Sequence, residues 1–440
     1  MDTPICDFVR RYVRSNALRL HMPGHKGVGP LGCEQLDITE ISGADSLYEA
    51  DGIIAQSERN ASALFGCPTF YSTDGSSQCL RAMLYLATRK NRKIVAGRNV
   101  HKTFLSAAAL LDLEVDWLYP EDRTAYLSCD ISAKKLEDYF CDCGQLPAAV
   151  YVTSPDYLGN VLDISALAAV CHRYGVLLLV DNAHGAYLKF LPVSRHPMDL
   201  GADLCCDSAH KTLPVLTGGA YLHVRDADLA NKSKDALALF GSTSPSYLIL
   251  QSLDAANALL ADPVYMQKLA ELSSQAGLVR QQLFHHGISD CFDNEPLKIV
   301  VQPRQYGYTG IEIAESLRQH GIECEFADPD FLVLMLTPAI GEADLQRVLD
   351  VLTGLPKRPA VTTATPMLGR PEKVLSIRDA IFSPSEKIPV SESLGRILAS
   401  PSVGCPPAVP IVVCGERIDE RAIACFQYYG IEECTVVKQS

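Results

Sequence analysis

The sequence has 440 residues, of which 48% are hydrophobic and 21% charged, and it carries a net charge of −13. A chain of this length exceeds a single hydrophobic core and predicts roughly two to four domains. The acidic balance excludes nucleic acid as the main partner, because phosphate backbones select basic surfaces. A negative field suits a cationic substrate, and it is equally typical of an ordinary acidic soluble protein.

The cysteines and the N-terminus indicate a reducing compartment. Sixteen cysteines are scattered without a Cys-x-x-Cys pair, and Cys141/Cys143 and Cys205/Cys206 lack the spacing of a zinc site. The first residues do not resemble a signal peptide, and no apolar run reaches the roughly 20 residues of a membrane span. We expect no metal, no membrane contact and a cytoplasmic protein.

The predicted elements in chain order begin with a short helix near 6–13 and a Gly/Pro loop over 21–27. Helices and strands then alternate, which predicts a mostly parallel sheet covered by helices. Ligands of such sheets bind at the carboxyl ends of the strands. The expected strands are 93–96, 148–152, 176–180, 202–206 and 219–224, and the expected helices are 78–87, 104–111 and 164–174.

Beyond this region the pattern changes to a smaller α/β unit, a proline-bearing connector and a compact tail. The expected strands here are 299–301 and 331–335, and the expected helices are 311–320 and 342–352. The predicted organisation is an N-terminal segment over 1–60, a large α/β domain over 61–255, a small α/β domain over 256–355 and a C-terminal domain over 356–440.

Asp181 and Lys211 each follow an apolar run that reads as a buried strand. An isolated lysine is usually a solvated surface charge, and an isolated aspartate often caps a helix. A carboxylate and a lysine that converge at two strand ends have a second use, which is pyridoxal phosphate (PLP) catalysis. The lysine forms a Schiff base with the aldehyde, and the aspartate keeps the pyridine nitrogen protonated.

Other polar residues could complete such a site. Ser76 and Ser77 follow Gly75 at an expected helix start, where backbone N–H groups favour phosphate, although a simple serine cap without a ligand is the more common explanation of such residues by themselves. His101 has the right residue type to stack on a cofactor ring. His184, three residues after Asp181, suits either a contact with the ring or a hydrogen bond within a turn.

One glycine motif is misleading. Residues 27–32 match G-x-G-x-x-G, but Pro30 and the residues after it give a poor helix start. A dinucleotide site needs a strand before the motif and a helix within it. We therefore expect no nicotinamide or flavin.

Together these segments resemble the Orn/Lys/Arg decarboxylase family of PLP enzymes, in the short form that lacks the N-terminal wing domain. The resemblance runs from about residue 18 to about residue 420. The matching segments, in order, are 20–26, 37–40, 75–77, 98–102, 154–159, 181–185, 208–212, 243–247 and 415–418.

The resemblance implies an α/β fold, the PLP-dependent transferase fold type I, with a mostly parallel sheet in the large domain, a smaller α/β domain and a C-terminal tail domain. It implies that Lys211 carries the cofactor, that Asp181 pairs with the pyridine nitrogen and that His101 stacks on the ring, with His184 beside it. The implied phosphate ligands are Ser76, Ser77, Ser208 and His210. Thr243 is expected to reach a neighbouring subunit's cofactor in a homodimer, and Glu416 to meet a cationic substrate.

Several positions depart from the family pattern. Asn182 replaces a usual glutamate and Tyr187 a common histidine, and Gly218 lies in the segment 216–219 that replaces a usual Thr-Gln pair. In the tail, Ala408 and Cys414 replace a glycine and a proline. The expected activity is decarboxylation of arginine, lysine or ornithine to a polyamine-precursor amine, with Lys211 or His210 as proton donor. The alternatives are another PLP reaction, such as transamination or lyase chemistry, and a non-catalytic paralogue that keeps the fold.

Overall fold

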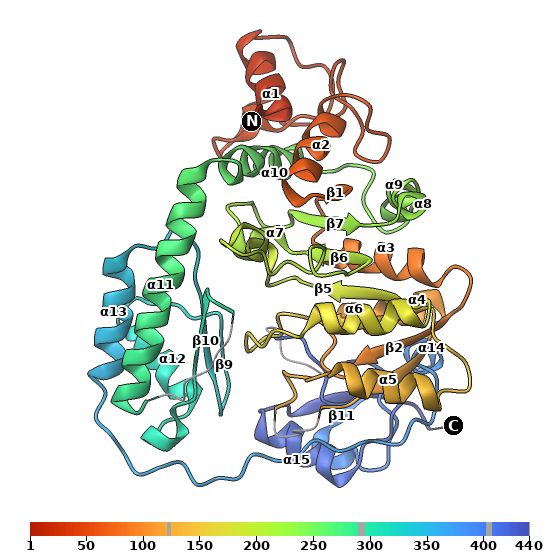
Figure 1. Cartoon of the computed structure of the whole chain (residues 1–440), viewed down its shortest axis with the longest axis vertical. Coiled ribbons are helices and arrows are strands. Elements are labelled where there is room, and N and C mark those ends of the chain that lie inside the picture. The colour runs from red at the N-terminus through yellow and green to blue at the C-terminus, as the bar shows by residue number, and fades with distance from the viewer. Residues whose placement is uncertain (121–124, 289–294, 402–406, 440) are drawn as a thin grey trace. The chain divides into compact units, whose positions relative to one another are not determined.

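The structure is a computed structural model that describes residues 1–120, 125–288, 295–401 and 407–439 (Figure 1). Contacts divide the chain into two compact units, each assembled from separate stretches of sequence. The first unit comprises 1–91, 148–151 and 164–267, and the second comprises 92–147, 152–163 and 268–440. Over the described ranges, every helix is too short or too polar to cross a membrane.

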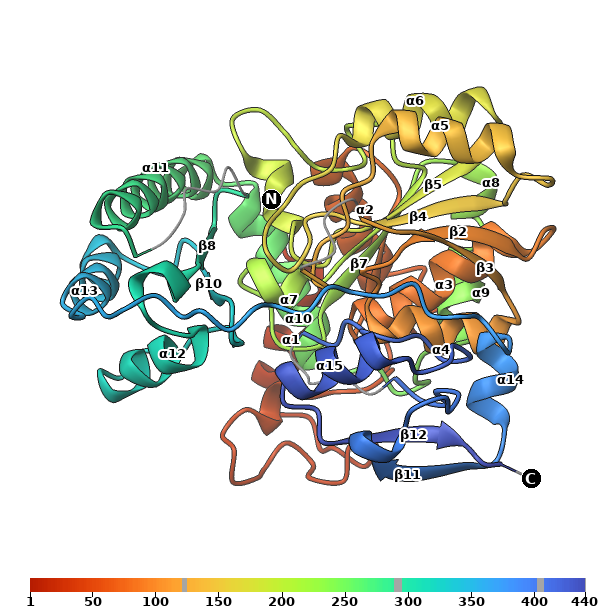
Figure 2. The same ribbon diagram turned by 90° about the horizontal axis from the view of Figure 1, so that it is seen from below.

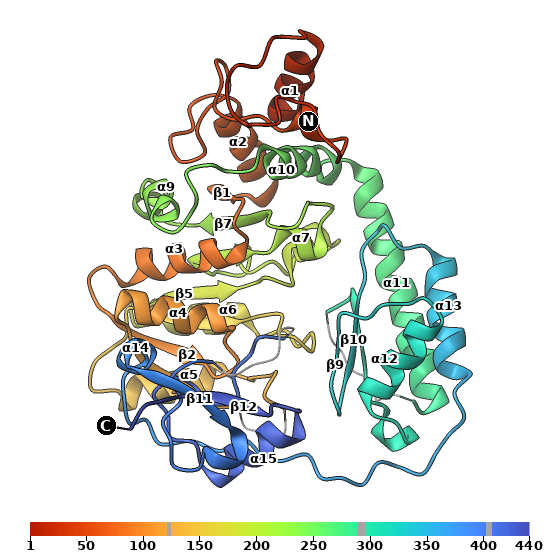
Figure 3. The ribbon, with the colours of Figure 1, turned by 180° about the vertical axis from the view of Figure 1, so that it is seen from behind.

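The first unit contains the N-terminal helices, the strand that ends in Asp181 and the short helix that carries Lys211. Its helices are α1 (Pro4–Arg14), α2 (Ile53–Phe65), α3 (Ser76–Thr88), α6 (Ile164–Arg173), α7 (Ala209–Thr212), α8 (Ala227–Ala230), α9 (Ser233–Ala238) and α10 (Tyr247–Leu260). Its strands are β1 (Thr69–Ser72), β5 (Leu177–Asp181), β6 (Leu204–Asp207) and β7 (Ala220–Val224). Helices α1, α2 and α10 pack against one another, as Figures 1 and 3 both show.

The second unit contains the small α/β part and the tail. Its helices are α4 (Lys102–Leu111), α5 (Ala133–Asp142), α12 (Gly310–Gln319), α13 (Glu342–Thr353), α14 (Ile377–Phe382) and α15 (Glu420–Tyr428). Its strands are β2 (Lys93–Gly97), β3 (Glu114–Leu118), β8 (Lys298–Val301), β9 (Phe326–Ala327), β10 (Leu332–Met335), β11 (Ser385–Pro389) and β12 (Glu433–Val437). Strand β4 (Ala149–Thr153) and helix α11 (Pro263–His286) have residues in both units.

The largest sheet has seven strands in the order β1-β7-β6-β5-β4-β2-β3. Strands β5 and β6 run parallel, with Asp181 opposite Cys206, whereas β7 runs antiparallel to both β6 and β1. The five strands expected in this region are confirmed, each to within about two residues. Leu178, Leu179 and Val180 of β5 are fully buried, so this strand is the apolar run expected of a central strand.

The smaller sheets organise the second unit. Strand β10 pairs antiparallel with β8 and β9, and helices α12 and α13 lie against each other beside this sheet (Figure 2). The tail forms a two-stranded antiparallel sheet of β11 and β12 that packs with α15 around a core of its own. Helix α12 begins with a capping box, in which Thr309 and Glu312 satisfy each other's backbone N–H groups.

Candidate active site

Lys211 lies one turn beyond the end of a central strand. Strand β6 ends at Asp207, Ser208 follows, and the short helix α7 carries Lys211. The Lys211 Nζ atom is 3.0 Å from Nε2 of His184, which comes from the loop after β5. The ring nitrogen and the amine share one proton in this contact. The geometry therefore places an imidazole nitrogen within hydrogen-bond distance of the lysine amine.

Asp181 is the last residue of β5 and is only 4% exposed. Its Oδ2 accepts a hydrogen bond from the Tyr151 hydroxyl at 2.9 Å, and its Oδ1 accepts one from the Ala183 N–H at 3.1 Å. Burial, followed by the charge of Asp181, raises the pKa of Tyr151 well above its ordinary value, so the phenol remains a donor. Two donors thus hold the carboxylate in one orientation at the strand end.

Two serines from different elements meet at an uncapped helix start. Ser76 begins α3 and its Oγ lies 2.8 Å from the Oγ of Ser208, and Ser77 is the next residue of the helix. The N-cap position is Gly75, which offers no side chain to the first-turn N–H groups. Two hydroxyls beside a helix N-terminus form a donor set that suits a phosphate group.

The Gly218–Gly219 segment supports this phosphate end of the site. The Gly218 carbonyl accepts a hydrogen bond from the Gly75 N–H at 2.8 Å. Gly218 has φ of +101°, and a Cβ there would lie 2.8 Å from the backbone oxygen of Thr73. Only glycine meets both demands. Gly218, which lies where the family usually has a Thr-Gln pair, therefore holds the loop before α3 through its backbone carbonyl.

His210 is fixed by the same glycine pair. Its Nδ1 lies 3.1 Å from the Gly219 carbonyl, which also accepts the His210 backbone N–H. A carbonyl only accepts, so Nδ1 carries a proton and Nε2 is the other tautomeric position. Burial lowers the pKa of His210, and the neighbouring charge of Lys211 lowers it further. The ring is thus held neutral and oriented.

These groups fit PLP. The set offers an amine for the aldehyde, a buried carboxylate for the ring nitrogen, and hydroxyls with a helix N-terminus for the phosphate. The Thr212 hydroxyl, buried next to Lys211, has no hydrogen-bond partner within the described part of the chain. Such an unsatisfied buried hydroxyl suits a site that is completed by a polar ligand.

Comparison with known families decides the class. The model of the Orn/Lys/Arg decarboxylase major domain matches residues 3–302, and the model of the family's C-terminal domain matches residues 370–435. The chain belongs to the Orn/Lys/Arg decarboxylase family. It is a PLP-dependent amino-acid decarboxylase with the PLP-dependent transferase fold type I, as the sequence predicted.

Similar proteins cover the chain nearly end to end. An arginine decarboxylase of Halalkalibacterium halodurans is 29% identical over 460 residues, which span 96% of this chain and 92% of the relative. An arginine decarboxylase of Bacillus subtilis is also 29% identical, with the same coverage. The solved lysine decarboxylase LdcF of Francisella novicida superposes with a TM-score of 0.83 at 16% identity, over 99% of this chain and 81% of that one.

Three further predicted site residues, His101, Thr243 and Glu416, are described by their own surroundings. In the decarboxylase His101 is the N-cap of α4, and its Nδ1 accepts the Thr103 N–H at 3.1 Å; it belongs to the second unit. Thr243 is exposed in the loop before α10. The site roles of both residues stay predictions.

Glu416 is buried in the second unit and already has a cationic partner. Its Oε2 accepts a hydrogen bond from the Arg98 guanidinium at 3.0 Å and another from the Val413 N–H at 2.7 Å. Arg98 also donates to the carbonyl groups of Pro410 and Ile411 and lies over the Trp117 ring. The sequence did not reveal Arg98 as this partner, because the two residues are 318 positions apart.

Proposed function

We propose that this decarboxylase removes the α-carboxyl group of a basic amino acid as CO₂ and releases the corresponding amine. Arginine, lysine and ornithine are the candidate substrates, with arginine first. The observation that carries the proposal is the arrangement of Lys211, His184 and Asp181 at the ends of β5 and β6. The relatives named arginine decarboxylase support the choice of arginine.

The proposed roles follow from the contacts. Lys211 carries the cofactor, and Asp181, oriented by Tyr151, faces the pyridine nitrogen. PLP supplies the electron sink for the carbanion left by CO₂. Ser76, Ser77, Ser208 and His210 hold the phosphate, and His101 and His184 flank the ring. Thr243 reaches the cofactor of a second subunit in a homodimer.

Lys211 is the better candidate for returning a proton to Cα. The Nδ1 proton of His210 is donated to the Gly219 carbonyl, and burial lowers the pKa of this imidazole, so it holds no spare acidic proton near neutral pH. The Lys211 amine lies beside His184 Nε2, which offers an exchange partner for the proton. For Glu416 we propose a supporting role as the counterion of Arg98 in place of direct substrate contact.

The test is CO₂ release by the purified protein with PLP on arginine, lysine, ornithine and a set of neutral amino acids. We expect yellow protein that acts on at least one basic substrate. Lys211→Ala should lose the colour and, by roughly a thousandfold or more, the activity, because the covalent step is lost. Lys232→Ala removes an exposed lysine of the same unit and should behave as wild type.

Three results would reject parts of this proposal. Activity on neutral amino acids alone would reject the basic substrate. Amino-group transfer without CO₂ release would reject decarboxylation, and a colourless wild type would indicate a non-catalytic paralogue. The homodimer, the cytoplasmic location and a place in polyamine formation belong to the same proposal. Light scattering of the purified protein tests the first of these.

A further inference from the structure

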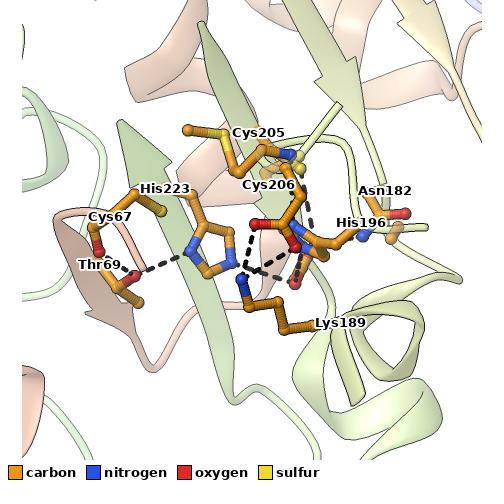
Figure 4. A network of polar contacts seen from close by, with 12 residues as sticks. Cys67, Thr69, Asn182, Lys189, His196, Cys205, Cys206 and His223 are labelled. Carbon is orange, nitrogen blue, oxygen red and sulfur yellow. Dashed lines mark hydrogen bonds and ion pairs between the residues drawn. The ribbon is translucent and has the colours of Figure 1, made fainter. Parts of the chain in front are cut away.

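A second polar cluster lies next to the proposed site, in the core of the first unit. His196, Asp207 and His223 are each fully buried, and we call them the buried triad. Figure 4 labels the two histidines of this triad. Asp207 Oδ2 lies 3.0 Å from His196 Nε2 and 3.1 Å from His223 Nε2. A carboxylate that receives two imidazole donors away from water is a costly arrangement that needs every partner in place.

Asn182 donates a hydrogen bond to the second oxygen of the Asp207 carboxylate. Its amide Nδ2 donates to Asp207 Oδ1 at 2.7 Å, and both residues are fully buried. A glutamate at position 182, as the family usually has, would place a second carboxylate against Asp207, and two like charges without water between them repel strongly. Asp207 thus explains the asparagine, and the two side chains form one hydrogen-bonded pair.

The hydrogen bonds assign a neutral state to His196. Its Nδ1 accepts the backbone N–H of Met198 at 3.3 Å, so this nitrogen has no proton. The proton is therefore on Nε2, which donates to Asp207. A histidine that binds a metal through Nε2 carries its proton on Nδ1 and donates it to a second partner. The buried triad has metal-ligand side chains, but His196 has the opposite tautomer.

The same reasoning makes His223 a cation. The Thr69 hydroxyl donates its single proton to the Cys67 carbonyl at 3.0 Å, so His223 Nδ1, at 2.9 Å from that hydroxyl, must be the donor. Nε2 donates to Asp207 as well. The Phe65 ring lies 4.4 Å from the imidazole, centroid to centroid, and an aromatic neighbour favours a cation. Burial lowers the pKa of His223, but Asp207 outweighs it and the net shift is upward.

The buried triad is joined directly to two proposed cofactor ligands. Asp207 precedes Ser208 at the end of β6, and Asn182 follows Asp181 at the end of β5. His223 comes from the neighbouring strand β7, whose register sets it opposite Cys205. The contacts of Asp207 therefore join the end of β6 to β7 and to the residue that follows β5, directly beside Ser208 and Asp181 in the chain.

We propose that the Asp207–His223 ion pair, with His196 and Asn182, is a positioning device that aims Asp181 and Ser208 at PLP. These are positioning residues, since they act through their neighbours in the chain. The proposal rests on the proposed cofactor site. It predicts that loss of the Asp207 charge weakens cofactor binding although every proposed ligand is retained.

The test compares Asp207→Asn with Leu250→Ala, which removes a fully buried side chain from α10 of the same unit. After PLP removal, the dissociation constant of PLP is measured for each protein and for wild type. Asp207→Asn should bind PLP roughly tenfold or more weakly, because misplaced ligands lose binding steeply. Leu250→Ala, at a comparable loss of melting temperature, should stay within about threefold of wild type, since α10 carries none of the proposed ligands.

A second measurement is made on the wild-type protein and uses a variant only to assign the signal. NMR of full-length holoenzyme labelled with ¹⁵N-histidine should show one imidazole, absent in His223→Gln, that keeps a proton on both nitrogens to a higher pH than an ordinary histidine. A neutral His223 would overturn the ion pair, and an unchanged PLP affinity in Asp207→Asn would overturn the positioning role. One bound zinc per chain by elemental analysis, lost in His196→Ala, would replace the proposal with a metal site. Wild type that binds no PLP would instead reject the proposed function.

Discussion

At the residue scale, Gly218 is the position where backbone geometry most directly limits substitution. Its φ of +101° lies where side chains are strained, and a Cβ would meet the Thr73 carbonyl at 2.8 Å. Gly218→Ala should therefore destabilise the protein by roughly 1–3 kcal/mol. It should also weaken PLP binding, because the Gly75 junction shifts. Thermal unfolding and PLP titration measure both effects.

Gly144→Ala is the matched control for this substitution. Gly144 has no left-handed φ, and a Cβ there meets nothing within 4 Å. The same chemical change should leave stability unchanged or raise it by roughly 0.4–1 kcal/mol, because alanine restricts the unfolded chain. Equal effects of the two substitutions would contradict the strain argument.

Ala408 is a second residue whose backbone lies in the left-handed region that favours glycine. It has φ of +57°, and the sequence comparison expected glycine there. The residue adopts the left-handed region, and its carbonyl accepts the N–H of Lys102, the first residue of α4, at 2.8 Å. Sequence alone identified the departure, but only the backbone explains why glycine is the usual residue.

The chemistry-bearing residues could be predicted because they sit in local patterns. Lys211, Ser208 and Asp181 follow apolar runs, and Ser76 follows a glycine at a helix start. Tyr151 could not be found in this way, since it reaches Asp181 from another strand 30 positions earlier and looks like one more apolar-strand residue. The same is true of His196 and His223, whose meeting at Asp207 is set by strand order.

At the element scale, the Arg98–Glu416 pair joins the segment after β2 to the segment before α15. Both side chains are at most 7% exposed. Arg98→Met leaves the Glu416 carboxylate buried with a backbone N–H, and it should cost roughly 3–5 kcal/mol of unfolding free energy. Denaturant unfolding measures this loss.

The double variant Arg98→Met/Glu416→Met separates charge from packing. Because no unpaired charge remains, it should recover most of the stability lost in the single variant. A single-variant loss below about 1 kcal/mol would show that the pair behaves as a surface salt bridge. An unchanged stability with a raised KM for the basic substrate would return Glu416 to the substrate-binding role.

Long apolar and helix-periodic segments were predicted well at this scale. The helices at 78–87, 104–111 and 164–174 correspond to α3, α4 and α6. The pair β11–β12 was not predicted, because β11 has the polar sequence Ser385–Pro389 and none of its residues is fully buried. Its pairing across some fifty positions is decided by the tail core, which local patterns do not reveal.

At the scale of the whole molecule, the pH dependence of stability should include a contribution from Asp328. This residue is 6% exposed, and burial raises the pKa of its carboxyl to about 7. Its Oδ1 accepts two backbone N–H groups, whereas Oδ2 has no partner among the described residues. A raised pKa means that the folded state holds the proton more tightly than the unfolded state. This contribution is complete below about pH 4 and is lost as the pH rises through 7.

Asp328→Asn removes this titration. Relative to wild type, the variant should therefore gain stability between pH 4 and pH 8, by on the order of 2–4 kcal/mol. Unfolding free energies of both proteins across this range measure the difference. A constant or falling difference would show that Asp328 is ionised throughout.

The division of the chain into compact units was harder to predict from the sequence than the residues of the site. The sequence predicted contiguous domains, and their boundaries stay predictions, whereas the compact units of the structure are built from separated stretches. Composition shifts mark where the chain changes character, but they do not say which distant segments pack together. The fold class could be predicted from the sequence, because alternating helices and strands are compatible with few architectures.

The proposed chemistry depends most on Lys211 as the residue that carries PLP. Borohydride reduction of the holoenzyme makes that link permanent, and peptide mass spectrometry then locates the added mass. We expect the reduced cofactor on the peptide that contains Lys211. In Lys211→Ala, that peptide should carry no cofactor. A reduced cofactor on any other lysine, or none in active enzyme, would contradict it.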